Sequence, residues 1–222
     1  MMRKPGPRIS MPFLFGMFLV LAPFSAALAQ EDQAVCCTRF DYVLEKTIFK
    51  VDAVRLDLTI RGETPTRVAE LVTGRVDPRA WSDSVAALYL CADQALVRMT
   101  FLRSFGLDRF LDANRDVMEK LSKAGWITED EFRELDRENR ARFEGLAEDG
   151  IRDGDVIEHE VRGDTVTTRY TDVTGTVRID GLLVGSAERR VLIGSLFGPD
   201  SDFRQGLLDL VFRRAETYGA GQ

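Results

Sequence analysis

Two hydrophobic periodicities follow one another along the chain: the two-residue period of strands and the 3.6-residue period of helices. Their order constrains the fold more than any other feature of the sequence. Residues 40–60 are rich in β-branched and aromatic side chains that alternate with polar ones, which predicts one long strand or two successive strands. Short helices are expected at 64–72 and after Asp77-Pro78. A strand at 96–102 follows them.

A pair of helices is predicted in the middle of the chain. From Leu107 onward apolar residues recur at helical spacing, and Gly125 ends this pattern. Thr128 and Glu131 then have the spacing of a capping box, in which each side chain accepts a backbone N–H of the other residue. They open a second helix that is expected to run to about Ala147.

The last third of the chain is predicted to form antiparallel strands and a closing helix. Asp180-Gly181 is the strongest hairpin signal, because a type I′ turn needs positive φ at both central residues. Ser201 is expected to cap the closing helix, which frays before Gly219. The strands are expected at 155–161, 165–171, 176–179 and 182–184. This order of elements predicts an α+β domain with a mainly antiparallel sheet.

Residues 1–29 have the three-part pattern of a cleavable export signal. Basic residues precede an apolar run at 11–22, and Ala27-Leu28-Ala29 is the small-x-small motif that a signal peptidase accepts. An uncleaved membrane anchor is the weaker alternative, since a spanning helix needs roughly 20 apolar residues. We therefore expect a signal peptide at 1–29, a mature chain that begins at Gln30, no stable membrane span after cleavage, and a periplasmic or secreted location.

The mature segment 30–222 has the size and composition of one globular domain. Three basic residues and no acidic ones leave with the signal, so the formal net charge moves from −6 to −9. This charge argues against nucleic acid as a partner. We expect a single domain over 30–222.

Three cysteines, Cys36, Cys37 and Cys91, cannot all pair within one molecule. In an oxidising compartment one bridge could join Cys36 or Cys37 to Cys91. The equal alternative is that Cys91 is a small buried residue and the doublet is free. The sequence leaves these two states open.

The chain contains no motif of a metal site, a phosphate loop, a dinucleotide-binding turn or a serine-hydrolase elbow. Its single histidine, His159, lies in a predicted strand and is expected to face solvent or a partner strand. The acidic residues of 129–138 surround a capped amphipathic helix, so we interpret them as a solvated face. No metal and no cofactor are expected.

Two positions interrupt apolar patterns, and function tends to lie where such patterns break. Lys50 and Asp52 share one side of the first strand region, where a buried lysine would need the carboxylate as its partner. The alternative is that this half of the strand faces water. Asn114 occupies the i+7 position from Leu107, and a buried amide there must hydrogen-bond to a neighbouring loop or to a ligand.

Several segments in the same order as here make the chain resemble the chalcone isomerase-like family, particularly its exported bacterial members. The resemblance implies an open, curved antiparallel sheet covered by helices, with a ligand cleft between the sheet and the helices. The matching segments are 47–53, 99–103 with the helix at 107–121, 154–157, 180–185, and the tail 197–199 with Phe203-Arg204.

The resemblance also implies a set of cleft residues. Plant enzymes of this family close a chalcone to a flavanone with an arginine, threonine and tyrosine hydroxyls, a lysine and an asparagine, whereas other plant members hold fatty acids through an arginine. Asn114 matches the asparagine, but Leu107 and Phe110 stand where the tyrosine and the lysine would be. Lys50 replaces the threonine, and Arg39 is the candidate arginine. Without the hydroxyls, an oxyanion has no visible donor, so chalcone cyclisation is not expected.

The leading hypothesis is an exported, non-catalytic domain that binds a small amphipathic ligand such as a fatty acid. One alternative is an intramolecular lyase of chalcone isomerase type in which Lys50 supplies the charge. Another is a structural or interaction module of the cell envelope, whose cleft is filled by its own side chains. The ligand-binding residues of the leading hypothesis are Arg39, Lys50, Asp52, Leu107, Phe110 and Asn114.

Overall fold

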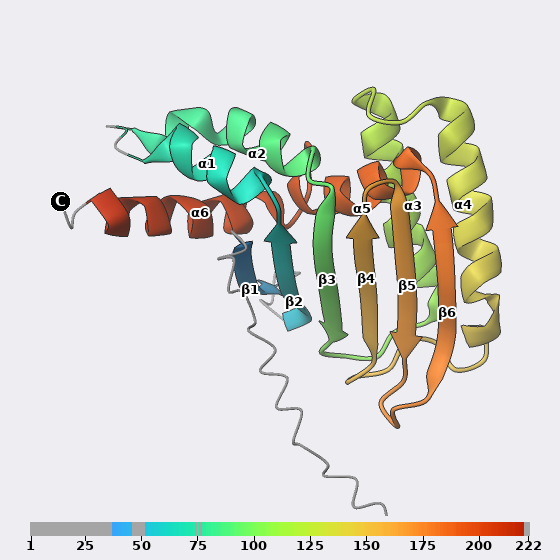
Figure 1. Cartoon of the computed structure of the whole chain (residues 1–222). Coiled ribbons are helices and arrows are strands. Elements are labelled where there is room, and N and C mark those ends of the chain that lie inside the picture. Colours follow the sequence, from blue (N-terminus) through green and yellow to red (C-terminus); the bar gives the residue numbers. More distant parts are fainter. Residues whose placement is uncertain (1–36, 46–51, 74, 76, 220–222) are drawn as a thin grey trace, which may run out of the picture. The chain divides into compact units, whose positions relative to one another are not determined.

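Six strands form one antiparallel sheet whose spatial order is the order of the chain, β1-β2-β3-β4-β5-β6 (Figure 1). The computed structural model describes residues 37–45, 52–73, 75 and 77–219. The strands are β1 (Cys37–Glu45), β2 (Asp52–Arg61), β3 (Gln94–Phe101), β4 (Val156–Arg162), β5 (Thr165–Thr171) and β6 (Val177–Val184). The helices are α1 (Thr64–Val72), η1 (Pro78–Trp81), α2 (Ser82–Leu90), α3 (Leu107–Lys123), α4 (Glu129–Phe143), η2 (Glu144–Leu146), α5 (Ser186–Phe197) and α6 (Arg204–Gly219).

One face of the sheet carries the helices and the core. Alternate residues of a strand point to opposite faces, and in β2 the buried set is Leu56, Leu58 and Ile60. α1, α2 and α6 lie over the β1–β2 side, and α3 and α4 lie over the β6 side, with α5 between these groups (Figure 1). Helices α3, α4 and α5 therefore face β3 to β6, which is where a cleft is found.

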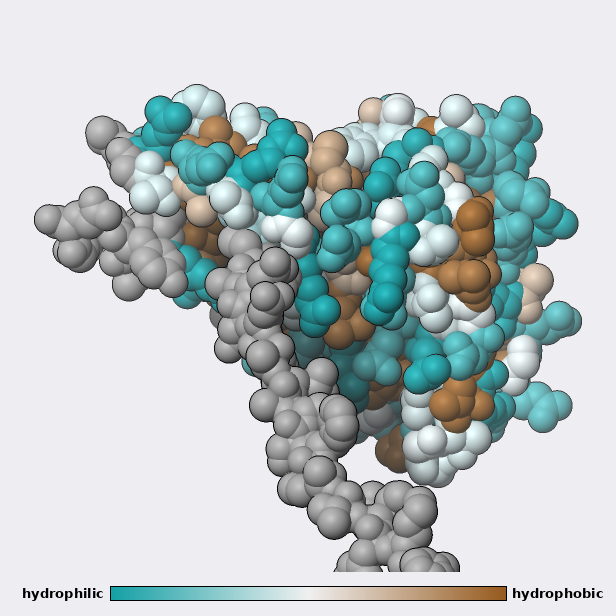
Figure 2. All heavy atoms as spheres, viewed as in Figure 1, coloured by the Kyte–Doolittle hydropathy of each residue, from teal (hydrophilic) through white to brown (hydrophobic). Residues whose placement is uncertain are grey.

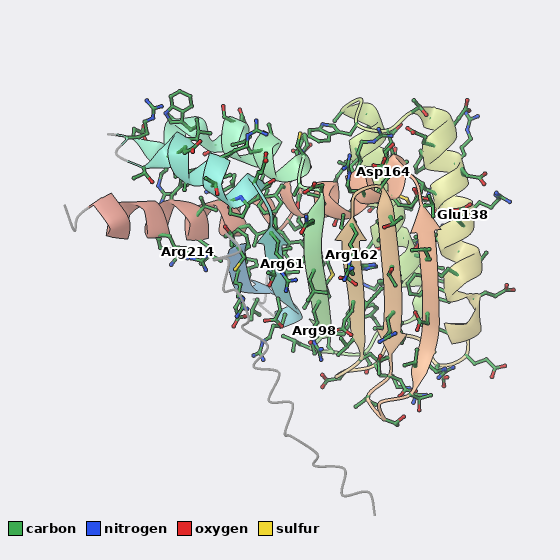
Figure 3. The ribbon with its side chains drawn as sticks, viewed as in Figure 1. Arg61, Arg98, Glu138, Arg162, Asp164 and Arg214 are labelled. Atoms are coloured by element: carbon green, nitrogen blue, oxygen red, sulfur yellow. The ribbon has the colours of Figure 1, made fainter. Side chains whose placement is uncertain are left out.

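No described element covers the other face of the sheet, which carries charged residues in cross-strand pairs. Arg98 Nη1 lies 3.0 Å from Glu158 Oε1, and Arg169 Nη2 lies 3.0 Å from Asp180 Oδ2. Figure 2 shows this face as a mixture of hydrophilic and hydrophobic residues, and Figure 3 shows Arg98 among the side chains that project from it. Opposite charges on neighbouring strands stabilise such a face while keeping it soluble.

Most of the predicted elements are present where the sequence places them. Residues 40–60 form two strands, and the helix at 64–72 has the predicted bounds. The capping box is complete: Glu131 N donates to Thr128 Oγ1 over 3.2 Å, and Thr128 N donates to Glu131 Oε2 over 2.8 Å. No helix within the described ranges is both long and apolar enough to cross a membrane.

The predicted hairpin at Asp180-Gly181 is wrong, because β6 runs unbroken from Val177 to Val184. The turn lies earlier, where the Asp172 carboxylate accepts the backbone N–H groups of Thr174 and Thr176, each over 3.0 Å. Gly175 supplies the positive φ of this turn, at 84°. Asp180 is instead a strand residue that is held by its ion pair with Arg169.

Two expectations about cysteines are also corrected. Cys37 and Cys91 are both free and both exposed, so no bridge joins them and Cys91 is not a buried apolar residue. Cys36, as well as Lys50 and the whole of residues 1–29, lies outside the described residues.

Candidate functional site

A cavity of about 150 Å³, partly open to solvent, lies between strands β3 to β6 and the helices α3, α4 and α5. Cavities of this volume hold a molecule of roughly the size of benzene. Most of its walls are apolar. The apolar lining residues are Met99, Phe110, Val117, Met118, Leu135, Phe143, Ile157, Val166, Leu183, Val191 and Leu192.

Helices α3 and α4 form one wall, and both use the same helical spacing. Residues at i, i+4, i+7 and i+8 lie on one face of a helix. The four lining residues of α3 are Phe110, Asn114, Val117 and Met118, and those of α4 are Leu135, Asn139, Arg142 and Phe143. The Phe110 and Phe143 ring centroids are 4.9 Å apart, so the start of α3 packs on the end of α4.

The sheet wall contains one polar pair. His159 of β4 and Thr168 of β5 are directly opposite in the register, and His159 Nδ1 lies 2.8 Å from Thr168 Oγ1. Burial, and to a smaller extent the positive charge of Arg142, lowers the pKa of His159 to about 4. The imidazole is therefore neutral at physiological pH.

The expectation that His159 faces solvent or a partner strand is met in part: its side chain contacts Thr168 of the neighbouring strand β5, but it also lines the cavity under the helices. It lies two residues from Ile157 and from Val161, and these three residues point to the same face of β4. Ile157 and Val161 are both buried, so the period of the strand carries His159 into the helix-covered side.

Arg142 is the one cation among the residues that line the cavity. Its side chain is half-buried, and no ion pair or hydrogen bond joins it to any described residue. Burial lowers the pKa of Arg142, while the negative charges of Glu138 and Glu188 act in the opposite direction. A partly desolvated guanidinium without a bound carboxylate is well suited to bind an anion, since it offers two parallel N–H donors.

Two amides also line the cavity, Asn114 from α3 and Asn139 from α4. The Asn139 Nδ2 atom is buried and has no hydrogen-bond partner among the described residues. A buried donor without an acceptor is uncommon and costs roughly 1–3 kcal/mol. Ser195, by contrast, is satisfied, because its Oγ donates to the Leu192 carbonyl over 2.7 Å.

The structure brings only part of the predicted residue set to this cavity. Phe110 and Asn114 line it, and Leu107 is buried next to Phe110 in the same apolar cluster. Arg39 is exposed on β1 and does not line the cavity; its backbone carbonyl accepts a hydrogen bond from Arg214. Asp52 begins β2, but its side chain is not among those described, and Lys50 lies outside the described residues.

The sequence contains a signal for Arg142, although it belongs to no known motif. Arg142 is at i+7 from Leu135 and directly precedes Phe143, so it occupies the apolar stripe of α4. A charged residue in such a stripe is the same kind of irregularity that marked Asn114. Asn139, at i+4 from Leu135, is a second irregularity in the same stripe.

No protein-family model and no curated protein sequence matches the chain. Among solved structures, the chain is similar to a fatty-acid binding protein of Arabidopsis thaliana, with a TM-score of 0.53 and 14% sequence identity. The match covers 82% of this chain and 87% of that chain. The expected fold, an α+β chalcone isomerase-like arrangement with an open antiparallel sheet, is thereby confirmed.

Proposed function

We propose that the chain is a non-catalytic binding protein for a small amphipathic carboxylate, such as a fatty acid. The ligand occupies the cavity between β3–β6 and α3–α5, with its carboxylate on Arg142. The single observation that carries the proposal is this half-buried guanidinium, which lines an apolar cavity and has no bound carboxylate among the described residues.

The shape and polarity of the cavity agree with such a ligand. A mostly apolar lining with a few polar groups is typical of small-molecule sites, because the apolar walls supply affinity and the polar groups fix orientation. The volume of about 150 Å³ accommodates a short body of about the size of benzene, and longer chains would extend through the open side. Because His159 is neutral, Arg142 is the cation that the described lining offers to the carboxylate, and the ligand carboxylate has to compete with the negative charge of Glu188, which also lines the cavity.

The structural neighbour supports the same ligand class. The Arabidopsis thaliana protein is a fatty-acid binding protein, and it shares the fold over most of both chains. Together with the ordered segments that resemble the chalcone isomerase-like family, this leads us to propose that the chain is a member of that family. The export pattern of residues 1–29 leads us to propose that it acts in the periplasm or outside the cell.

The cavity beside Asn114 argues against the alternative of a structural module whose cleft is filled by its own side chains. Arg142 replaces Arg39 as the proposed carboxylate ligand, because it lines the cavity whereas Arg39 is exposed on β1.

The test is the affinity for octanoate and decanoate, measured by isothermal titration calorimetry on wild type, Arg142→Gln and Arg137→Gln. Arg137 is the matched control: it lies on α4, and it forms an exposed ion pair with Glu134. A hydrogen-bonded charge pair contributes roughly 1.5–3 kcal/mol, so Arg142→Gln should weaken binding at least tenfold. Arg137→Gln should leave the affinity within twofold of wild type.

Octanol and decanol separate the role of the charge from that of the apolar walls. These alcohols should bind wild type and Arg142→Gln equally, because they carry no charge for the guanidinium. Absence of carboxylate binding by wild type at millimolar concentration would overturn the proposed function. If Arg142→Gln and Arg137→Gln lose the same amount of carboxylate affinity, Arg142 is not the residue that binds the carboxylate.

A further inference from the structure

The middle of the α3–α4 wall is polar, and nothing in the described protein satisfies it. The two helices are antiparallel neighbours, and the ring contact between Phe110 and Phe143 fixes their relative register. One turn away from that contact lie Asn114 on α3 and Asn139 on α4, so the two amides stand at the same level of the wall.

Apolar residues lie beyond both sides of this amide pair. The aromatic pair Phe110 and Phe143 is on one side, and Met118 and Leu135 are one turn further on the other. The amides are therefore a polar band across an otherwise apolar wall. No hydrogen bond joins the Asn114 side chain to a described residue, and Asn139 Nδ2 is buried without an acceptor.

A plain alkyl chain would leave this band unsatisfied. Filling the cavity with methylene groups would leave the buried Asn139 donor without an acceptor, which is destabilising. A ligand with an oxygen at that level would accept the Nδ2 hydrogen and remove the cost. The difference in affinity between ligands with and without this oxygen is expected to be large, because a site that hydrogen-bonds a polar group of its ligand binds an analogue without that group much more weakly.

This inference rests on the proposed function and deepens it. We propose that the cavity selects carboxylates that carry a hydroxyl or keto oxygen on their chain, and that Asn139 is the residue that recognises this oxygen. Asn139 lies three residues before Arg142 on α4, and side chains at that spacing start about 5–6 Å apart. The oxygen is therefore expected near the carboxylate end of the chain rather than at its far end.

The experiment compares four ligands by calorimetry: decanoate, 3-hydroxydecanoate, 5-hydroxydecanoate and 10-hydroxydecanoate. Wild type should bind 3-hydroxydecanoate or 5-hydroxydecanoate at least fivefold more tightly than decanoate. 10-Hydroxydecanoate, whose hydroxyl is at the far end of the chain, is the matched ligand control. Its affinity should not exceed that of decanoate.

The protein side of the comparison uses Asn139→Leu, with Asn139→Ala as a second variant in case leucine overfills the cavity. Both should abolish the hydroxyl preference while decanoate binds at least as tightly as to wild type. Their melting temperatures without ligand should equal or exceed that of wild type, because no protein hydrogen bond is lost. Arg142→Gln should weaken all four acids by the same factor and keep the preference.

The outcomes separate the two proposals. Decanoate binding that depends on Arg142 but shows no preference among the four acids overturns the role of Asn139 and leaves the proposed function standing. A preference that persists in both Asn139 variants, or a clear fall in their melting temperature, also overturns it. If none of the acids binds wild type, both proposals are wrong.

Discussion

At the scale of single residues, the cavity combines polar groups whose protonation the protein controls. His159 is the clearest case, since burial and Arg142 together lower its pKa to about 4 from the ordinary value of 6.5. Thr168, which is 1% exposed, holds its Nδ1 atom on the sheet wall. The charged groups that face the imidazole from the helices, Arg142 of α4 and Glu188 of α5, also line the cavity.

The lowered pKa predicts how stability depends on pH. Between pH 6.5 and pH 4 the unfolded chain binds a proton on His159 while the folded protein does not, so stability is lost as the pH falls through this window. Because the His159 side chain is only partly buried, this group should account for a loss of about 1–2 kcal/mol in unfolding free energy between pH 7.5 and pH 5.

Urea unfolding at pH 7.5, 6 and 5 measures the effect in wild type and His159→Gln. The variant has no group that titrates there, so the difference in unfolding free energy between the two proteins should narrow, or change in favour of the variant, as the pH falls. Parallel pH profiles would show that His159 has an ordinary pKa.

The site residues differ in how far the sequence could predict them. Asn114 was predictable because it interrupts the strong apolar pattern of α3, and Phe110 because it belongs to that pattern. Arg142 and Asn139 lie in the weaker stripe of α4, which is surrounded by charged residues, so two more polar positions did not stand out. The position of His159 at the cavity was not predictable, because the face of a strand that is covered depends on where distant helices pack.

At the scale of elements, local signals were enough for some helices and insufficient for others. The capping box of α4 and the proline at the start of α1 act within one turn, so they could be predicted from adjacent residues. α5 was not predicted, because buried residues follow one another closely along it instead of forming one stripe. Its buried residues are Leu192, Ile193, Gly194, Leu196 and Phe197.

Burial of α5 depends on a close approach to α3 at Gly194. A Cβ at this position would lie 2.8 Å from Leu121 Cδ2 and 2.9 Å from its Cδ1, and Leu121 is itself only 1% exposed. Gly194→Ala should therefore lower the unfolding free energy by about 1–2 kcal/mol, since the overlap outweighs the gain in helix propensity.

Gly145→Ala is the control for this substitution. No atom lies within 4 Å of a Cβ placed on Gly145, so the change in unfolding free energy should stay within about 0.5 kcal/mol. Chemical denaturation of the three proteins gives the comparison. If Gly194→Ala is as stable as wild type, α5 and α3 can move apart at little cost in free energy. The cavity that they line would then be more deformable than the structure indicates.

At the scale of the whole molecule, the strand order follows the chain order, so every paired strand in the sheet is the neighbour of its partner in sequence. The sequence of periodicities could predict such a sheet, because no pairing had to be inferred across a crossover. The position of the cavity could not be predicted in the same way. It depends on the consecutive helices α3 and α4 meeting the distant helix α5 over β3 to β6.

The export signal is the last whole-molecule prediction, and it concerns where the cavity meets its ligand. Expressed in a bacterial host, the full chain should lose residues 1–29 and yield a periplasmic or secreted protein whose first residue is Gln30. Intact mass spectrometry of the periplasmic fraction and N-terminal sequencing measure this directly. Ala29→Lys removes the small residue that the peptidase requires and should leave the longer chain attached to the membrane fraction, whereas Gln30→Asn, just after the site, should be processed normally. A full-length chain in the cytoplasmic fraction for wild type would contradict export, and the ligand would then have to be sought among cytoplasmic carboxylates.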